Sequence, residues 1–430
     1  MHHLLPEPPE PGTVGCRRLA LQRLMGALAW CAAWPAAALA SDPRPQPRPP
    51  ACRAWPLWQG FLDKFVQADG RVIDDQFQTR YTTSEGQAYA LFFCLVNDDR
   101  PRFDTLLRWT ETHLAGGSLQ ARLPGWRWGR DDRGEWRLID SNPASDADLW
   151  LAHTLFEAAR LWQAPAYRDT AQALLRQVQD TAVVQLPGFG AMLLPAPAGF
   201  AQDGAWRLNP SYLPLHQLRA FTREDPQGPW AKLAGHTVSM LEAVTHPTGF
   251  APDWVAYAPP RGWHATDTSP ALGSYDAIRV YLWAGLVHPS DPLRPALLSA
   301  VRGMRNWLAR GEAGPPQQVR TDSGQGQGLM PGPVGFSGAL LPYLNATGRS
   351  ALRARQAQRV ATALRHGAPQ PAPAGCSGGA TAVASAWVGE SPTYYDQVLC
   401  LFGVGAVEGR YRFTADGTLQ RPTGVGSTWA

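Results

Sequence analysis

Three carboxylic acids, far apart in the sequence, lie at the starts of predicted helices. Glu85, Asp146 and Asp276 each stand within the first turn of an apolar helical pattern. Two carboxyl groups, one protonated and one ionised, can act as general acid and general base, and the hydrolysis of glycosides uses such a pair. The three acids are therefore the candidate catalytic residues of this chain.

Each acid also has a purely structural interpretation. Acidic side chains at helix starts cap free N–H groups and complement the helix dipole. Asp276 is followed one turn later by Arg279, which is close enough for an ordinary ion pair. The same ion pair would keep Asp276 ionised, as a base requires, and burial would raise the pKa of Glu85, as an acid requires. At this point packing and catalysis both remain open.

The aromatic composition favours a ligand with flat faces. The 430 residues include 18 Trp, 42 Gly and 40 Pro. Trp126, Trp128, Trp136 and Trp150 lie close to Asp146 in the chain, at a density that packing alone seldom needs. Aromatic residues at this level suit carbohydrates, although part of the Trp content belongs to an ordinary core.

The elements that must position these side chains are mostly helices. Apolar periodicity predicts helices over residues 58–66, 85–97, 102–114, 146–162, 167–178, 229–244, 274–287, 293–308, 337–344, 351–364 and 393–404. Strand candidates are few, namely 136–139, 191–194 and 410–413. Because helices continue without a break in composition or a fixed repeat, we expect one all-α domain over residues 55–430.

The N-terminal region has the pattern of an export signal over residues 1–40, and an upstream extension within it is left open. An arginine-rich start precedes an apolar run at 24–39, and Ala38-Leu39-Ala40 offers a cleavage site. The run is short for a stable membrane span, and an N-terminal anchor is the alternative. The predicted location is the periplasm or the medium.

Two further segments are expected outside the helices. A Pro-rich linker is expected at 41–54, and a Pro-, Gly- and Ala-rich loop insertion at 366–389.

Charge and cysteine content bear on three questions: nucleic-acid binding, disulfide bonds and metal sites. A formal net charge of +4 with no basic run argues against nucleic acid. Cys94 and Cys400 lie in apolar runs and are expected to be buried thiols, whereas a bridge between Cys52 and Cys376 stays open. No Cys/His spacing resembles a metal site, so we expect neither a metal nor a cofactor.

Six stretches, taken together, resemble glycoside hydrolase family 8 and cover the chain from about residue 55 to 413. They are residues 84–87, 123–129, 142–150, 209–214, 252–255 and 274–280. More narrowly, they resemble the periplasmic endoglucanases that accompany bacterial cellulose synthase. The resemblance implies an (α/α)6 barrel with a few short strands and long loops, a cleft for a β-1,4-glucan at the N-terminal ends of the inner helices, and inversion at the anomeric carbon.

Roles follow from the resemblance position by position. Glu85 matches the general acid, Asp276 the base that activates water, and Asp146 the carboxylate that holds the distorted sugar. The implied or candidate substrate-binding residues are Trp126, Trp128, Trp150, Tyr212, Tyr275 and Arg279. An inverting enzyme keeps its acid and base roughly 6.5–9.5 Å apart to admit a water molecule.

The predicted function is that of an inverting endo-β-1,4-glucanase acting during bacterial cellulose synthesis or export. Its partners would be a β-1,4-glucan chain and, functionally, a cellulose synthase complex. Two alternatives stay open. One is a glucan-binding or assembly factor with weak catalysis, and the other is the same fold acting on xylan, chitosan or mixed-linkage glucan.

Overall fold

The computed structural model describes residues 54–75, 80–371 and 382–422. The predicted signal, nearly all of the predicted linker, and the pair Cys52 and Cys376 lie outside these ranges. Cys94 and Cys400 are free and buried, which confirms that prediction. Within the described ranges, no helix combines the length and the apolar character that crossing a bilayer requires.

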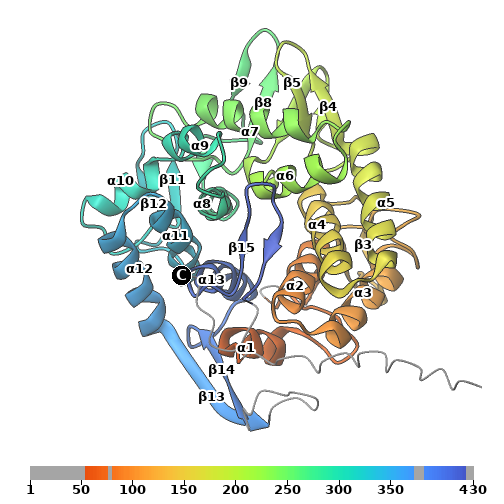
Figure 1. The fold of residues 1–430 in the computed structure, drawn as a ribbon. Helices are drawn as coiled ribbons and strands as arrows, with labels where there is room; N and C mark the ends of the chain where they lie inside the picture. Colours follow the sequence, from red (N-terminus) through yellow and green to blue (C-terminus); the bar gives the residue numbers. More distant parts are fainter. Residues whose placement is uncertain (1–53, 76–79, 372–381, 423–430) are drawn as a thin grey trace, which may run out of the picture. The chain divides into compact units, whose positions relative to one another are not determined.

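Six inner helices are surrounded by an outer layer of helices (Figure 1). The inner helices are α2 (Ser84–Val96), α4 (Ser145–Trp162), α6 (Leu215–Glu224), α8 (Ala277–Leu286), α11 (Val334–Ala346) and α13 (Tyr394–Val407). The outer helices are α1 (Pro56–Phe65), α3 (Arg100–Leu114), α5 (Pro165–Ala182), α7 (Trp230–Val244), α9 (Arg294–Ala300), α10 (Gly303–Ala309) and α12 (Ser350–Ala363). The outer helices α3, α5, α7, α9 and α12 each pack against the inner helix that precedes them, α1 packs against α13, and α10 contacts α12. This alternation is an (α/α)6 barrel, as predicted.

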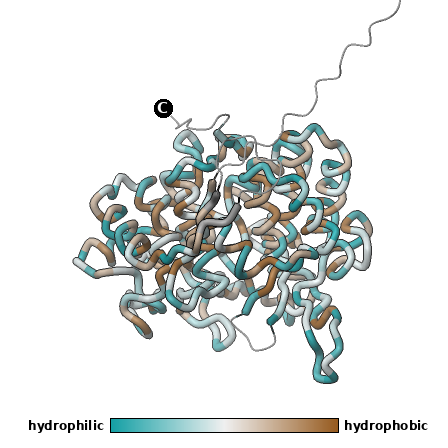
Figure 2. The backbone as a smooth tube through the Cα atoms, turned by 90° about the horizontal axis from the view of Figure 1, so that it is seen from below, coloured by the Kyte–Doolittle hydropathy of each residue, from teal (hydrophilic) through white to brown (hydrophobic). Residues whose placement is uncertain are grey.

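Sequence pattern explains the two layers. Helix α2 is apolar on nearly every side and is buried from Gly86 to Val96, whereas α3 buries one stripe and exposes the rest. In Figure 2 the outer turns and loops are mainly hydrophilic, and hydrophobic stretches run through the interior. An all-apolar helix must be enclosed by neighbours, so the chain alternates between enclosed and half-exposed helices.

Aromatic rings fill the centre of the barrel. The Trp150 ring lies 5.0 Å from Phe92, 5.3 Å from Trp283 and 5.1 Å from Phe402, measured between ring centroids. Only 1% of Trp150 is exposed. The prediction that Trp150 contacts substrate is therefore wrong, because its whole side chain is used in packing the core.

Short antiparallel sheets lie in the connections between the helices and after α13. The sheet beside the predicted acids has the order β1 (Thr82–Thr83), β2 (Arg127–Arg130), β3 (Trp136–Asp140). The other strands are β4 (Val183–Leu186), β5 (Gly190–Leu193), β6 (Ala201–Gln202), β7 (Ala205–Leu208), β8 (Val255–Ala258), β9 (Gly262–His264), β10 (Leu272–Gly273), β11 (Gln318–Arg320), β12 (Gly326–Gln327), β13 (Leu364–Pro371), β14 (Ala382–Val388), β15 (Arg412–Phe413) and β16 (Leu419–Gln420). The three predicted strands match β3, β5 and β15. Most of the others are too short to show an alternating pattern.

Three segments differ from the sequence prediction. The described ends of the predicted 366–389 loop form the hairpin β13–β14, in which Ala386 and Val388 are buried and β14 packs against α1. Gly60 on α1 allows this contact, because a Cβ there would lie 2.0 Å from the Ala386 carbonyl oxygen. The predicted helix 293–308 is divided into α9 and α10, and the short helix α6 was not predicted.

Candidate active site

The start of α2 holds Glu85 in a defined setting. Thr83 caps the helix by accepting a hydrogen bond from the Gly86 amide at 3.2 Å. Glu85 Oε1 accepts a hydrogen bond of 3.2 Å from Trp126 Nε1, which comes from the segment just before β2. The predicted acid and the predicted cleft-wall tryptophan are thus in direct contact, although 41 residues separate them in the chain.

Asp146 and Asp276 both approach the same nitrogen of one guanidinium group, that of Arg279. Arg279 Nη2 is 2.8 Å from Asp276 Oδ1 and 3.8 Å from Asp146 Oδ2. The Asp146 side chain is 3% exposed and the Asp276 side chain is 27% exposed. The starts of α4 and α8 therefore bring one enclosed and one accessible carboxylate to the same arginine.

Further polar groups fix the position of Arg279. Its Nη2 also donates to Ser211 Oγ at 2.8 Å, and its Nη1 donates to the Tyr395 hydroxyl at 3.2 Å. That hydroxyl in turn donates to the main-chain carbonyl of Tyr275 at 2.6 Å. The Arg279 guanidinium lies 5.8 Å from the centroid of the Tyr212 ring. A held guanidinium keeps the orientation of the Asp276 carboxylate defined.

Burial and neighbouring charges raise the pKa values of two of the acids, Glu85 and Asp146. Burial, aided by the nearby charge of Asp146, raises the pKa of Glu85 to about 8, while Arg279 and the Trp126 hydrogen bond act in the opposite sense. Burial also raises the pKa of Asp146 to about 6, against the attraction of Arg279. At neutral pH the site can thus hold a proton on Glu85 beside an ion-paired Asp276, which is the division of labour that acid and base catalysis needs.

The predicted aromatic residues fall into two groups. Trp126 is half-buried against Glu85, and the Tyr275 residue is 42% exposed. Trp128 instead stacks on Trp136, with ring centroids 4.8 Å apart and planes inclined by 10°, and meets Trp109 edge-on. Its other ring contacts among the described residues are with His113 and Arg71, so the structure does not bring Trp128 to the carboxylates.

Comparison with known proteins assigns the family. A model of the glycosyl hydrolases family 8 matches residues 49–409. The chain belongs to glycosyl hydrolase family 8. This family membership confirms the resemblance inferred from the six sequence stretches.

Relatives in family 8 are similar over most of their length. An endoglucanase of Xanthomonas axonopodis pv. citri (strain 306) is 45% identical over 395 residues, covering 92% of this chain and 94% of that protein. An endoglucanase of Escherichia coli (strain K12) is 41% identical over 369 residues, covering 86% and 91%. The crystal structure of an endo-1,4-D-glucanase from Vibrio fischeri ES114 superposes with a TM-score of 0.72 at 34% identity, covering 85% of this chain and 99% of that one.

Sequence reasoning missed a residue that supports Asp276. Asp253 Oδ1 accepts hydrogen bonds from the backbone amides of Ser274, Asp276 and Ala277 at 2.7, 3.1 and 2.7 Å. It thereby fixes the backbone from which the Asp276 side chain extends. Asp253 was part of the stretch 252–255 that carried the family resemblance. The amides that it accepts from lie more than 20 residues later in the chain, so no local sequence pattern predicts these hydrogen bonds.

We expect Asp253→Ala to destabilise the protein by roughly 2–4 kcal/mol, because three amides lose a charged acceptor. Turnover should fall as well, since the Asp276 backbone is no longer held. Urea unfolding and initial hydrolysis rates measure the two effects. The control is Asp253→Asn, which retains an acceptor oxygen and should lose less of both. Equal losses in the two variants would contradict a role as acceptor.

Proposed function

We propose that this chain is an inverting endo-β-1,4-glucanase that hydrolyses cellulose-like glucan. The observation that carries the proposal is that Glu85, whose pKa is raised, lies near Asp146, and that Asp146 shares Arg279 with the accessible Asp276. The family 8 relatives named endoglucanase support the substrate class. The aromatic side chains around the carboxylates supply faces on which sugar rings can stack.

In the proposed reaction, Glu85 donates its proton to the glycosidic oxygen as the bond from that oxygen to the anomeric carbon breaks. A water molecule attacks the anomeric carbon from the opposite face and gives its proton to Asp276. The proton is thus lost from one carboxyl and gained by the other, and exchange with solvent resets both. Trp126 orients the Glu85 carboxyl, and Arg279 orients the Asp276 carboxylate.

Hydrolysis of carboxymethylcellulose, followed by NMR of the anomeric protons, tests the proposal. A rapid drop in viscosity together with few new reducing ends would indicate cleavage within the chain. The first product should be the α-anomer, because a single displacement inverts a β-linkage. If the β-anomer came first, the inverting mechanism would be wrong. A panel of xylan, chitosan and mixed-linkage glucan, cut more slowly than cellulose derivatives, would support the substrate preference.

Asp146 is proposed to hold the distorted sugar and to leave proton transfer to the other two acids. Asp146→Asn should lower the turnover number strongly while both limbs of the pH–rate profile persist. The alkaline limb should move to lower pH, because the charge of Asp146 helps to raise the pKa of Glu85. Initial rates between pH 4 and pH 10 measure this. Loss of a limb in this variant would show that Asp146 transfers a proton itself.

We further propose that the protein is exported and acts during cellulose synthesis or export, as its N-terminal pattern and the family resemblance suggest. Sequencing the N-terminus of the mature protein tests the export, since cleavage after residue 40 is expected. In a strain that lacks the protein, the wild type should restore cellulose export and Glu85→Gln should not. Equal rescue by both would favour the alternative role of a glucan-binding or assembly factor.

A further inference from the structure

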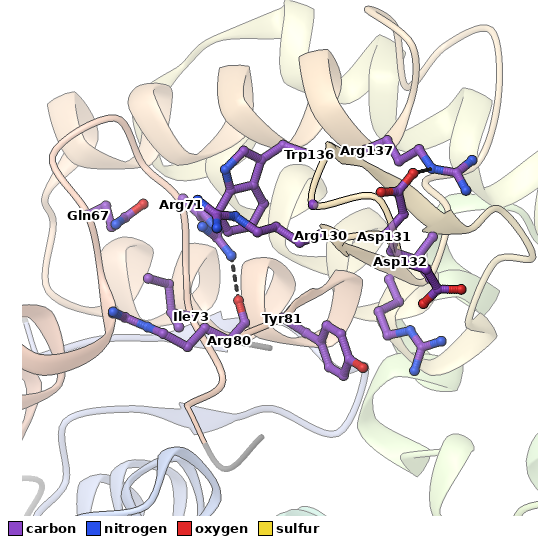
Figure 3. A pocket seen from close by; sticks show the side chains of 13 residues that line it. Gln67, Arg71, Ile73, Arg80, Tyr81, Arg130, Asp131, Asp132, Trp136 and Arg137 are labelled. Atoms are coloured by element: carbon purple, nitrogen blue, oxygen red, sulfur yellow. Dashed lines mark hydrogen bonds and ion pairs between the residues drawn. The ribbon is translucent and has the colours of Figure 1, made fainter. Parts of the chain in front are cut away.

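A basic pocket lies beside the start of α2, outside the cluster of carboxylates. Its volume is about 830 Å³, and its wall comes from the segment after α1, from the approach to β1 and from the hairpin β2–β3 (Figure 3). Five arginines and two aspartates line this arginine pocket, namely Arg71, Arg80, Arg127, Arg130, Arg137, Asp131 and Asp132. The formal charge of the lining is therefore strongly positive.

The arginine pocket contains guanidinium groups that have no ion-pair partner among the described residues. The Asp131 carboxylate is engaged by Arg137 at 2.7 Å. No carboxylate of the described ranges comes within ion-pair distance of Arg71, Arg80 or Arg130, although the charge of Asp69 partly offsets that of Arg71. A protein usually offsets such a group of like charges internally, so the positive charge here is available to an external anion.

Arg71 lines the pocket although only 6% of the residue is exposed, so its guanidinium is a buried positive group at the pocket wall. Its Nε donates to Thr82 Oγ1 at 2.8 Å and its Nη2 to the Arg80 carbonyl at 2.5 Å, as Figure 3 shows for the latter. The guanidinium carbon lies 4.7 Å from the Trp128 ring and 4.5 Å from the Trp136 ring. Burial and the charge of Arg80 lower the pKa of Arg71 to about 10. A bound anion would offset both costs.

The arginine pocket and the proposed general acid share one small sheet. Thr83 pairs with Arg127 across β1 and β2, and Glu85 follows Thr83 by two residues. Trp126, the neighbour of Arg127, donates to Glu85. The Arg127 guanidinium, which lines the pocket, lies 5.1 Å from the centroid of the Trp126 ring, so the arginine pocket is next to the place where Glu85 meets a bound polymer.

We propose that the arginine pocket binds a carboxylate or phosphate group carried as a substituent on the glucan chain that Glu85 cleaves. Guanidinium forks match oxyanions of this geometry, whereas the hydroxyl groups of an unsubstituted glucan need no fixed positive charge. The inference rests on the proposed function, and it deepens that function by naming a class of substrate, the acid-substituted β-1,4-glucans.

The variant for the test is Arg80→Gln/Arg130→Gln, because both side chains are exposed and neither contacts the carboxylate cluster. The control is Arg310→Gln/Arg349→Gln, which removes two exposed arginines, one at the end of α10 and one at the start of α12. With carboxymethylcellulose, KM should rise roughly tenfold in the first variant only, and the turnover number should stay unchanged. With neutral hydroxyethylcellulose of matched length, KM should stay unchanged in both variants. Equal changes on the two polymers, or none, would overturn the proposal.

Binding is measured separately by electrophoresis through gels that contain either polymer. A lack of hydrolysis can then be distinguished from a lack of anion binding in the pocket. If wild type cuts neither polymer, the proposed function fails, and retardation by the anionic gel that is lost only in Arg80→Gln/Arg130→Gln still supports the pocket. Inorganic phosphate added to the gel should compete with that retardation. Phosphate that stabilises the wild type against heating, without any selective retardation by the anionic gel, would assign the pocket to a free anion and overturn the polymer as its source. Retardation equal in all three proteins would overturn the site.

Discussion

Glu85→Gln should lower kcat/KM on cellulose derivatives by roughly 10²–10⁴-fold, because an amide cannot donate a proton to the leaving oxygen. The substitution keeps the shape of the side chain and an oxygen that can accept the Trp126 hydrogen bond. Binding of a cello-oligosaccharide, measured by calorimetry, should therefore change little. In wild type the rate should fall as the pH rises through the pKa of Glu85, which burial has raised to about 8.

Stability provides an independent check on the same substitution. The pKa of Glu85 is higher in the folded protein than in the unfolded chain, so its stabilising contribution is lost as the pH rises through the folded value. Glu85→Gln should therefore be more stable than wild type above about pH 8, and the gap should narrow at lower pH. A variant with nearly full activity would remove Glu85 from the role of acid. A gap independent of pH would contradict the perturbed pKa.

Asp276→Asn should cause a loss of comparable size, roughly 10²–10⁴-fold in the turnover number, because an amide cannot take the proton from the attacking water. The alkaline limb of the pH–rate profile, which belongs to Glu85, should persist in this variant. Steady-state rates across pH 4 to pH 10 measure the loss of turnover and this limb. Circular dichroism and thermal unfolding show whether the barrel is intact.

A matched control for Asp276→Asn is Asp99→Asn. Both aspartates form an ion pair with the arginine three residues later, Asp276 with Arg279 at 2.8 Å and Asp99 with Arg102 at 2.9 Å, but Asp99 lies outside the carboxylate cluster and the arginine pocket. The control should keep the turnover number of wild type. If the two variants lost activity equally, breaking an ion pair would account for the effect and Asp276 would not be the base.

Local sequence pattern determined the helices and the candidates for chemistry. Apolar periodicity depends only on neighbours within a few turns, so five of the six inner helices, all except the short α6, and the acids at the starts of three of them could be predicted without any tertiary information. The family resemblance added the barrel, which the structure and the comparisons confirm. The same local view misjudged Trp150, because an indole near a candidate acid in the chain has the same sequence signature whether it faces a cleft or the core.

Tertiary structure alone decided which groups meet. The hydrogen bond from Trp126 to Glu85, the approach of Arg279 to Asp146, and the three amides held by Asp253 all join segments that are distant in the sequence. The pKa of Glu85 depends on this enclosure, because desolvation and the charge of Asp146 exist only once the helices have packed. The arginine pocket has the same origin: its residues are scattered over more than 60 positions, and only the folding of β1, β2 and β3 gathers their charges around one space.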